Sequence, residues 1–330
     1  MGNDEMGDMA ETAGLSELRG SSRLGESSEL RAQRQFFAEE VQTVANVRTP
    51  ALVEAFARVP REGFLGPGPW LIRGEGDFGA ASPRLTIDAD PRRILHNVVV
   101  AIDPARHLFN GQPSTLAVWI DALGLRASDR VLHVGCGLGY YTALMAECVG
   151  ETGKVVAVEV DPALAARASE HLARYGAGSG SGCGSSSGSV DVRCGNGVEL
   201  DDDPPFDAII VNAGMTHPHD AWLQALKPGG RLVLPLTCAF PQAGPTIGKG
   251  IVLLITRGDG NAVAADSFAA RVLTFVAIYS AQGIRNSTTE TLLGQAMRQN
   301  PFPSLTRLRR DPHDPSSSCW LHTDGFCLSA

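Results

Sequence analysis

The sequence predicts an α/β fold in which a mostly parallel sheet is covered by helices on both faces. From about residue 114 onward, short apolar runs suited to buried strands alternate with segments suited to helices. Residues 131–139 (VLHVGCGLG) and 155–161 (VVAVEVD) flank a helical segment, so this region is expected to form a strand, a glycine turn, a helix and a second strand. With 43% hydrophobic residues, the 330-residue chain can bury a substantial core.

The N-terminal third predicts helices and loops ahead of the sheet. Residues 1–35 are polar and rich in Ser, Gly and Glu, which predicts a disordered tail, with a helix beginning near its end. A second helix is expected from Pro50, with Thr49 as N-cap, and it should stop at Pro60. Residues 61–112 are rich in Gly and Pro and predict loops, and a further helix is expected at 114–123.

Seven strands and three helices are expected in the core. The strands are placed at 130–134, 155–159, 190–194, 207–211, 230–234, 250–256 and 269–277, and the helices at 140–149, 162–175 and 218–226. The low-complexity insert 176–189 predicts a flexible loop. A last helix at 287–299, opened by a Ser287/Glu290 capping box, precedes a final strand or hairpin. These elements define a tail (1–35), one domain (36–285) and a C-terminal extension packed on it (286–330).

Composition excludes several classes of protein. The net charge is −8 and basic runs are short, which argues against nucleic-acid binding. No apolar stretch has the length of a signal peptide or a membrane span, so a cytoplasmic protein without a membrane partner is expected, as a monomer. The seven cysteines include no C-x-x-C pair, so neither a disulfide framework nor a zinc site is expected. His217 and His219 lack an evident third ligand, so no metal is predicted there either.

The glycine turn favours S-adenosylmethionine (SAM) over a dinucleotide. A dinucleotide fingerprint would require glycine at position 140, where this chain has Tyr140. SAM has no pyrophosphate, and its carboxylate can lie near the amides that open the following helix. Glu159 follows Gly135 by 24 positions, which is suitable for holding the ribose hydroxyls. Cys136 is interpreted as a small side chain that fills space in the turn.

Five segments together resemble the protein-L-isoaspartate O-methyltransferases: 52–66 (LVEAFARVPREGFLG), 131–146, 155–165, 206–214 (FDAIIVNAG) and 226–236 (LKPGGRLVLPL). The resemblance covers roughly residues 45–285. It implies a doubly wound, seven-stranded, Rossmann-like class I methyltransferase that uses SAM and acts on a protein or peptide carrying a carboxylate. It also implies a set of cofactor residues, namely His133, Gly135, Cys136, Gly137, Gly139, Glu159, Val160, Asn196, Gly197 and Asn212.

Two positions depart from the pattern of this family. His133 stands where the family usually has an acidic residue, and Asn196 stands where it commonly has Asp in Gly-Asp-Gly, whose carboxylate accepts from the adenine amino group. The family stretch G-Q-T-I-S-Q-P corresponds here to residues 111–116, which are shorter and rearranged. Ser114 and Thr115 are the expected ligands of a substrate carboxylate, although Ser114 also suits an N-cap.

The acceptor decides whether a catalytic base is needed. A carboxylate is already ionised at neutral pH, whereas an amine or hydroxyl acceptor needs a base, for which His217 is the candidate. Three hypotheses about the function remain open. The protein is a protein or peptide carboxyl methyltransferase, a specialised methyltransferase with another acceptor, or a SAM-binding module without turnover.

Overall fold

The computed structural model describes residues 27–74, 83–176, 188–200, 203–240, 246–259 and 267–330. Most of the predicted tail and most of the insert 176–189 lie outside these ranges. The first helix, α1 (Ser28–Ala45), already occupies the end of the predicted tail, because the Ser27 side chain caps it and its residues Arg34 and Phe37 are buried. Among the described residues, no helix is long and apolar enough to cross a membrane.

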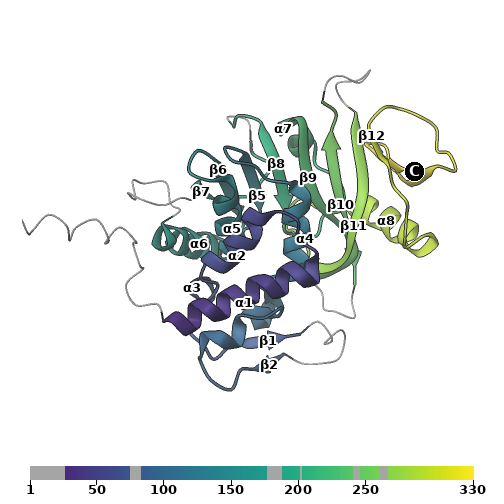
Figure 1. Ribbon diagram of the computed structural model, residues 1–330. Coiled ribbons are helices and arrows are strands. Elements are labelled where there is room, and N and C mark those ends of the chain that lie inside the picture. The colour runs from purple at the N-terminus through teal and green to yellow at the C-terminus, as the bar shows by residue number, and fades with distance from the viewer. Residues whose placement is uncertain (1–26, 75–82, 177–187, 201–202, 241–245, 260–266) are drawn as a thin grey trace, which may run out of the picture.

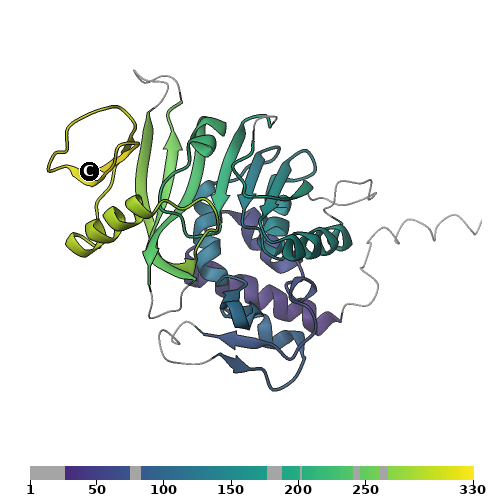
Figure 2. The same cartoon turned by 180° about the vertical axis from the view of Figure 1, so that it is seen from behind.

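A ten-stranded mixed sheet forms the centre of the molecule (Figures 1 and 2). Its order is β13-β14-β12-β11-β10-β9-β8-β5-β6-β7. The neighbouring strands from β7 to β9 pair in parallel: β7 (Ser189–Cys194), β6 (Lys154–Glu159), β5 (Arg130–Val134), β8 (Phe206–Val211) and β9 (Leu226–Ala239). The remaining strands pair antiparallel: β10 (Ile247–Arg257), β11 (Phe268–Tyr279), β12 (Arg307–Arg309), β13 (Cys319–His322) and β14 (Cys327–Ser329).

Successive side chains of each strand point to opposite faces of this sheet. Val131, Ala157 and Ile210 belong to the apolar cluster covered by α1, α2 (Pro50–Arg58), α4 (Pro113–Leu123), α5 (Tyr140–Val149) and α6 (Pro162–Tyr175). Leu132 and Val134 belong to the opposite cluster, which includes residues of α7 (Asp220–Ala225) and α8 (Ser287–Gln299). The doubly wound arrangement is thus confirmed.

Several predicted boundaries match the structure. The helices at 140–149, 162–175 and 287–299 begin and end at the predicted residues. The α8 cap is Asn286, whose side chain accepts from the Thr289 amide, so the predicted Ser287/Glu290 capping box is wrong. Glu290 instead accepts from the Ala239 amide and pairs with Arg285.

Within the described part of the chain the sheet has ten strands and not the predicted seven, because the C-terminal extension continues it. β12 pairs with β11, and β14 and β13 follow outward as a hairpin, drawn in yellow at one edge of the sheet in Figure 1. Arg310 attaches this extension further by a hydrogen bond to Asp220, and Trp320 joins two parts of the extension by donating to the Asn300 carbonyl.

The segment 61–112, predicted to be loops, holds a second, smaller sheet. Its order is β2-β1-β3-β4, from β2 (Arg84–Leu85), β1 (Leu71–Arg73), β3 (Val99–Asp103) and β4 (Leu108–Phe109), and it follows the short α3 (Glu62–Leu65). Its apolar residues Ile72 and Val100 pack with Leu138 of the glycine turn and Leu164 of α6. These strands are too short to show an alternating apolar pattern in the sequence, so their formation depends on tertiary packing.

Arg61, in the segment Val-Pro-Arg-Glu that follows α2, connects distant parts of the chain. Its guanidinium is fully buried and donates to three backbone carbonyls, those of Ile94, His96 and Val98. Arg61 therefore holds the connection into β3, which lies between the N-terminal helices and the small sheet.

A candidate cofactor site at the carboxyl ends of the parallel strands

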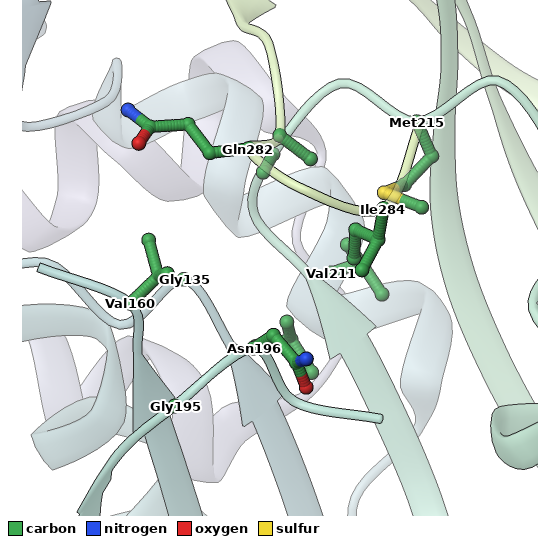
Figure 3. Close-up of a pocket in the computed structure, with 11 residues that line it drawn as sticks. Gly135, Val160, Gly195, Asn196, Val211, Met215, Gln282 and Ile284 are labelled. Carbon is green, nitrogen blue, oxygen red and sulfur yellow. The ribbon is translucent and has the colours of Figure 1, made fainter. Parts of the chain in front are cut away.

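A depression lies where the parallel strands end, the position at which open α/β sheets bind ligands (Figure 3). It is lined by residues following β5, β6, β7 and β8 and by a segment following β11. The lining residues are Val134, Gly135, Val160, Gly195, Asn196, Val211, Ala213, Met215, Ala281, Gln282 and Ile284.

The glycine turn after β5 has the left-handed backbone that its composition predicts. Gly135, Gly137 and Gly139 have φ values of +78°, +57° and +88°. A Cβ on Gly139 would come within 2.9 Å of the Leu172 side chain, so this glycine allows α6 to pack closely. A Cβ on Gly137 would meet no protein atom within 4 Å, so this glycine leaves the turn open to a ligand.

Glu159 closes the turn from the end of β6. Its carboxylate accepts from the Gly137 amide at 2.8 Å and from the Asp161 amide at 3.1 Å, and the residue is only 7% exposed. A carboxylate can accept about four hydrogen bonds, so acceptor capacity is left for a ligand hydroxyl. Its neighbour Val160 is 44% exposed and lines the depression.

Asn196 lies on the turn after β7. Its side-chain oxygen accepts from the Val198 amide at 3.1 Å, which leaves that oxygen a second lone pair. Gly197 has a φ of +74°, and its carbonyl accepts from Trp222 Nε1. Asn212 follows β8, and its backbone amide donates to the Val134 carbonyl, which joins the ends of β8 and β5.

His133 and Cys136 are both buried, and burial shifts each pKa in the direction that favours the neutral side chain. Desolvation lowers the pKa of His133 to about 3, so its imidazole is neutral at physiological pH. Its Nδ1 lies 2.9 Å from the Thr142 hydroxyl, and its Nε2 has no hydrogen-bond partner within the described part of the chain. Burial raises the pKa of the Cys136 thiol far above its usual value, as expected for a side chain that fills space.

The segment before α4 adjoins the glycine turn through α5. Tyr141, in the first turn of α5, donates to the Gly111 carbonyl at 2.8 Å. The side-chain amide nitrogens of Asn110 and Gln112 are buried and have no partner among the described residues. Ser114 is buried and lies inside α4, and its amide donates to Asn97 Oδ1. The α4 N-cap is Gln112 and not Ser114. Neither Ser114 nor Thr115 lines the depression.

The loop after β8 carries His217, which also does not line the depression. Its Nδ1 lies 3.0 Å from the Thr216 hydroxyl, whose oxygen accepts from the Asn286 amide. Desolvation, then the neighbouring His219, lower the pKa of His217, so the ring is neutral at pH 7. His219 is the N-cap of α7, where its Nδ1 accepts from the Ala221 amide.

The segment 280–286 contributes to the depression, and sequence reasoning did not find it. Arg285 anchors this segment by donating to the Gly214 carbonyl and to the backbone and hydroxyl oxygens of Thr237. As a result, Gln282 and Ile284 face residues that follow the parallel strands (Figure 3). No motif marks these residues, because their position depends on strands far away in the chain.

Comparison with known proteins identifies the family. Residues 99–249 match the family described as protein-L-isoaspartate(D-aspartate) O-methyltransferase. The protein-L-isoaspartate O-methyltransferase of Methylorubrum extorquens is 32% identical over 230 residues, which cover 69% of this chain and 82% of that protein. The chain belongs to the protein-L-isoaspartate O-methyltransferase family. It is thus a methyltransferase that uses SAM.

Other relatives are similar over different shares of their length. Protein-L-isoaspartate O-methyltransferase 1 of Rhodopseudomonas palustris is 33% identical over 62% of this chain and 69% of its own. Protein-L-isoaspartate O-methyltransferase 2 of Archaeoglobus fulgidus is 36% identical, and this chain spans only 52% of it.

Solved structures of the family share the fold. A protein-L-isoaspartate O-methyltransferase structure superposes with a TM-score of 0.56 at 22% identity, covering 84% of this chain and 73% of its own. The structure of a second such protein, from Plasmodium falciparum in complex with S-adenosyl-L-homocysteine, superposes with a TM-score of 0.51 at 16% identity. The match covers 76% of this chain and 98% of that chain.

Proposed function

We propose that the chain methylates the free carboxylate of isoaspartyl residues in proteins or peptides. The family supports this acceptor, since its members are named for it. The observation that carries the proposal is the pair of buried side-chain amide nitrogens of Asn110 and Gln112, which have no partner in the described residues. Buried donors without an acceptor are costly, so they favour a ligand that supplies acceptor oxygens, as a carboxylate does.

The cofactor residues predicted from sequence are proposed to act as follows. The turn formed by Gly135, Gly137 and Gly139 would hold the methionine end of SAM, with Gly137 leaving it open, so that the carboxylate of SAM would lie near the N-terminus of α5. Glu159 accepts from the ribose hydroxyls. Asn196 accepts from the adenine amino group.

Other predicted residues line or support this region. The exposed Val160, which lines the depression, would pack against the adenine, and Gly197 and Asn212 would shape the adjoining turns. The neutral His133 would not repel the ammonium of SAM, and its buried Nε2 has no hydrogen-bond partner among the described residues.

Bound SAM supplies an electrophilic methyl group for an in-line displacement, so catalysis depends mainly on alignment. The amide donors of Asn110 and Gln112 would hold the acceptor carboxylate, and the glycine turn would hold the cofactor. A carboxylate has a pKa near ~4 and needs no base. We propose that Thr115 and Ser114 support this substrate segment from the start of α4, and that the enzyme acts as a cytoplasmic monomer.

A second candidate function is methylation of an amine or hydroxyl. The neutral imidazole of His217 favours it, because a neutral histidine can accept a proton from such an acceptor. In that case the protein would be a specialised methyltransferase that has kept the scaffold and changed its acceptor.

The test combines calorimetry with a methyl-transfer assay. SAM binding is measured by isothermal titration, and transfer of tritiated methyl groups is then followed on an isoaspartyl peptide and on the same peptide with ordinary aspartate. We expect binding, and turnover on the isoaspartyl peptide alone. Turnover only on other acceptors would favour the second function, and binding without turnover would contradict both.

A matched pair of variants tests the substrate contact. Gln112→Glu replaces a buried donor with a carboxylate that repels the acceptor, and it should lower kcat/KM by about tenfold or more with SAM affinity unchanged. Gln35→Glu, on the exposed face of α1, is the control and should change neither value. An unchanged kcat/KM for Gln112→Glu would show that Gln112 does not contact the substrate.

A further inference from the structure

Four side chains that bind soft metals gather in the C-terminal extension. They are His313, Cys319, His322 and Cys327, and their ligand atoms all lie within 4.8 Å of one another. His322 and Cys327 face each other across the β13–β14 hairpin, Cys319 begins β13, and His313 comes from the loop after β12. This edge of the sheet lies at the opposite end from β7, away from the cofactor site.

The spacing is close to that of a tetrahedral site. His313 Nε2 lies 3.8 Å from Cys319 Sγ. Zinc with Zn–S near 2.3 Å and Zn–N near 2.0 Å places neighbouring ligand atoms about 3.4–3.8 Å apart. The two imidazole rings lie 4.8 Å apart between centroids at an interplanar angle of 84°. The cluster therefore needs only a small contraction to surround an ion.

Hydrogen bonds already orient the ligands. His313 Nδ1 lies 2.8 Å from the Asp311 carbonyl, and because a carbonyl only accepts, this nitrogen carries the proton and Nε2 keeps its lone pair. The Ser316 amide donates to Cys319 Sγ, which holds that sulfur in place. His322 Nδ1 is buried and has no hydrogen-bond partner among the described residues.

We propose that His313, Cys319, His322 and Cys327 bind a structural zinc ion. Two sulfur and two nitrogen donors favour Zn²⁺ over the hard cations Mg²⁺ and Ca²⁺. All four positions are filled by protein side chains, which is typical of a structural site and leaves no place for a substrate. The ion joins the loop 310–318 to the hairpin and so fastens the extension to the edge of the sheet.

The ligand spacing explains why the site escapes a search for C-x-x-C pairs. The spacing is H-x5-C-x2-H-x4-C, so histidine and cysteine ligands alternate along the chain and the two cysteines are not close together in the sequence. Only the hairpin register brings Cys327 opposite His322.

The experiment measures the metal content of the full chain. The protein is purified under reducing conditions without chelator, and its metal content is measured by elemental mass spectrometry. We expect about one zinc per chain. After the zinc is exchanged for Co²⁺, the visible spectrum should show the d–d bands of a tetrahedral site and a sulfur-to-cobalt charge-transfer band. Chelation should lower the melting temperature of the protein.

The variants His313→Gln and Cys319→Ser should each lose most of the zinc and the cobalt bands. His313→Gln changes a loop side chain, so the rest of the fold is retained and can be checked by SAM binding. Cys194→Ser, at an exposed free cysteine elsewhere, is the control and should keep the metal. Wild-type protein that takes up neither Zn²⁺ nor Co²⁺, or His313→Gln that keeps the wild-type spectrum, would overturn the proposal. So would a disulfide between Cys319 and Cys327 in the freshly purified chain.

Discussion

Replacing Glu159 with alanine tests the cofactor site most directly. The carboxylate is almost fully buried and accepts from two backbone amides, those of Gly137 and Asp161. If it also accepts from the ribose of SAM, its loss removes a hydrogen bond to a charged group, which contributes about 1.5–3 kcal/mol. The SAM dissociation constant should then rise by about 10- to 150-fold.

The same substitution should destabilise the protein, because two amides lose their acceptor. A fully buried amide without an acceptor costs about 1–3 kcal/mol, and since both of these hydrogen bonds are only partly buried, the free energy of unfolding should fall by less than twice that amount. Glu159→Gln retains one acceptor oxygen and should lie between wild type and Glu159→Ala for both properties. Glu151→Ala, at an exposed position before β6, is the control and should change neither.

The assay is isothermal titration with two ligands, S-adenosylhomocysteine and its analogue without the ribose hydroxyls, alongside urea unfolding followed by circular dichroism. Only the hydroxylated ligand should show the full loss of affinity in Glu159→Ala. Equal losses for both ligands would mean that Glu159 acts only on the glycine turn and does not hold the ribose.

Three further predictions follow from the site. Gly137→Val should abolish SAM binding measured by calorimetry, since its φ of +57° and its opening toward the ligand both exclude a branched side chain. Gly150→Val, at φ +66° and also without a protein atom near its Cβ, is the control for backbone strain, and an equal loss of affinity there would refute the assignment. His217→Ala should change kcat on an isoaspartyl peptide only slightly, whereas a base would cost about 10²- to 10⁴-fold and remove a limb of the pH–rate profile. His133 should make the protein lose stability in acid. Its pKa is about 3 when folded and 6.5 when unfolded, so between these values the unfolded state binds more protons and stability falls with decreasing pH, by up to about 1.4 kcal/mol per unit. His133→Asn should flatten this dependence in urea unfolding at pH 4–7, and an unchanged slope would show that His133 is not its source.

The local elements of the core could be predicted from the sequence because their signals are short-range. The glycine turn, the helix at 140–149 and the strand ending at Glu159 depend on apolar periodicity and on φ values that favour glycine. The resemblance to the family depended on these same segments. For this reason the parallel half of the sheet, where the candidate cofactor site lies, was predicted nearly in full.

Tertiary structure alone decided the features that depend on contacts between distant segments. The small sheet in 61–112 exists because Ile72 and Val100 find Leu138 and Leu164 to pack against. The sheet continues past β11 because residues 307–329 pair with its edge, and that pairing also brings His313 close to Cys319. Such contacts join residues far apart in the chain, and periodicity within one segment carries no information about its partner.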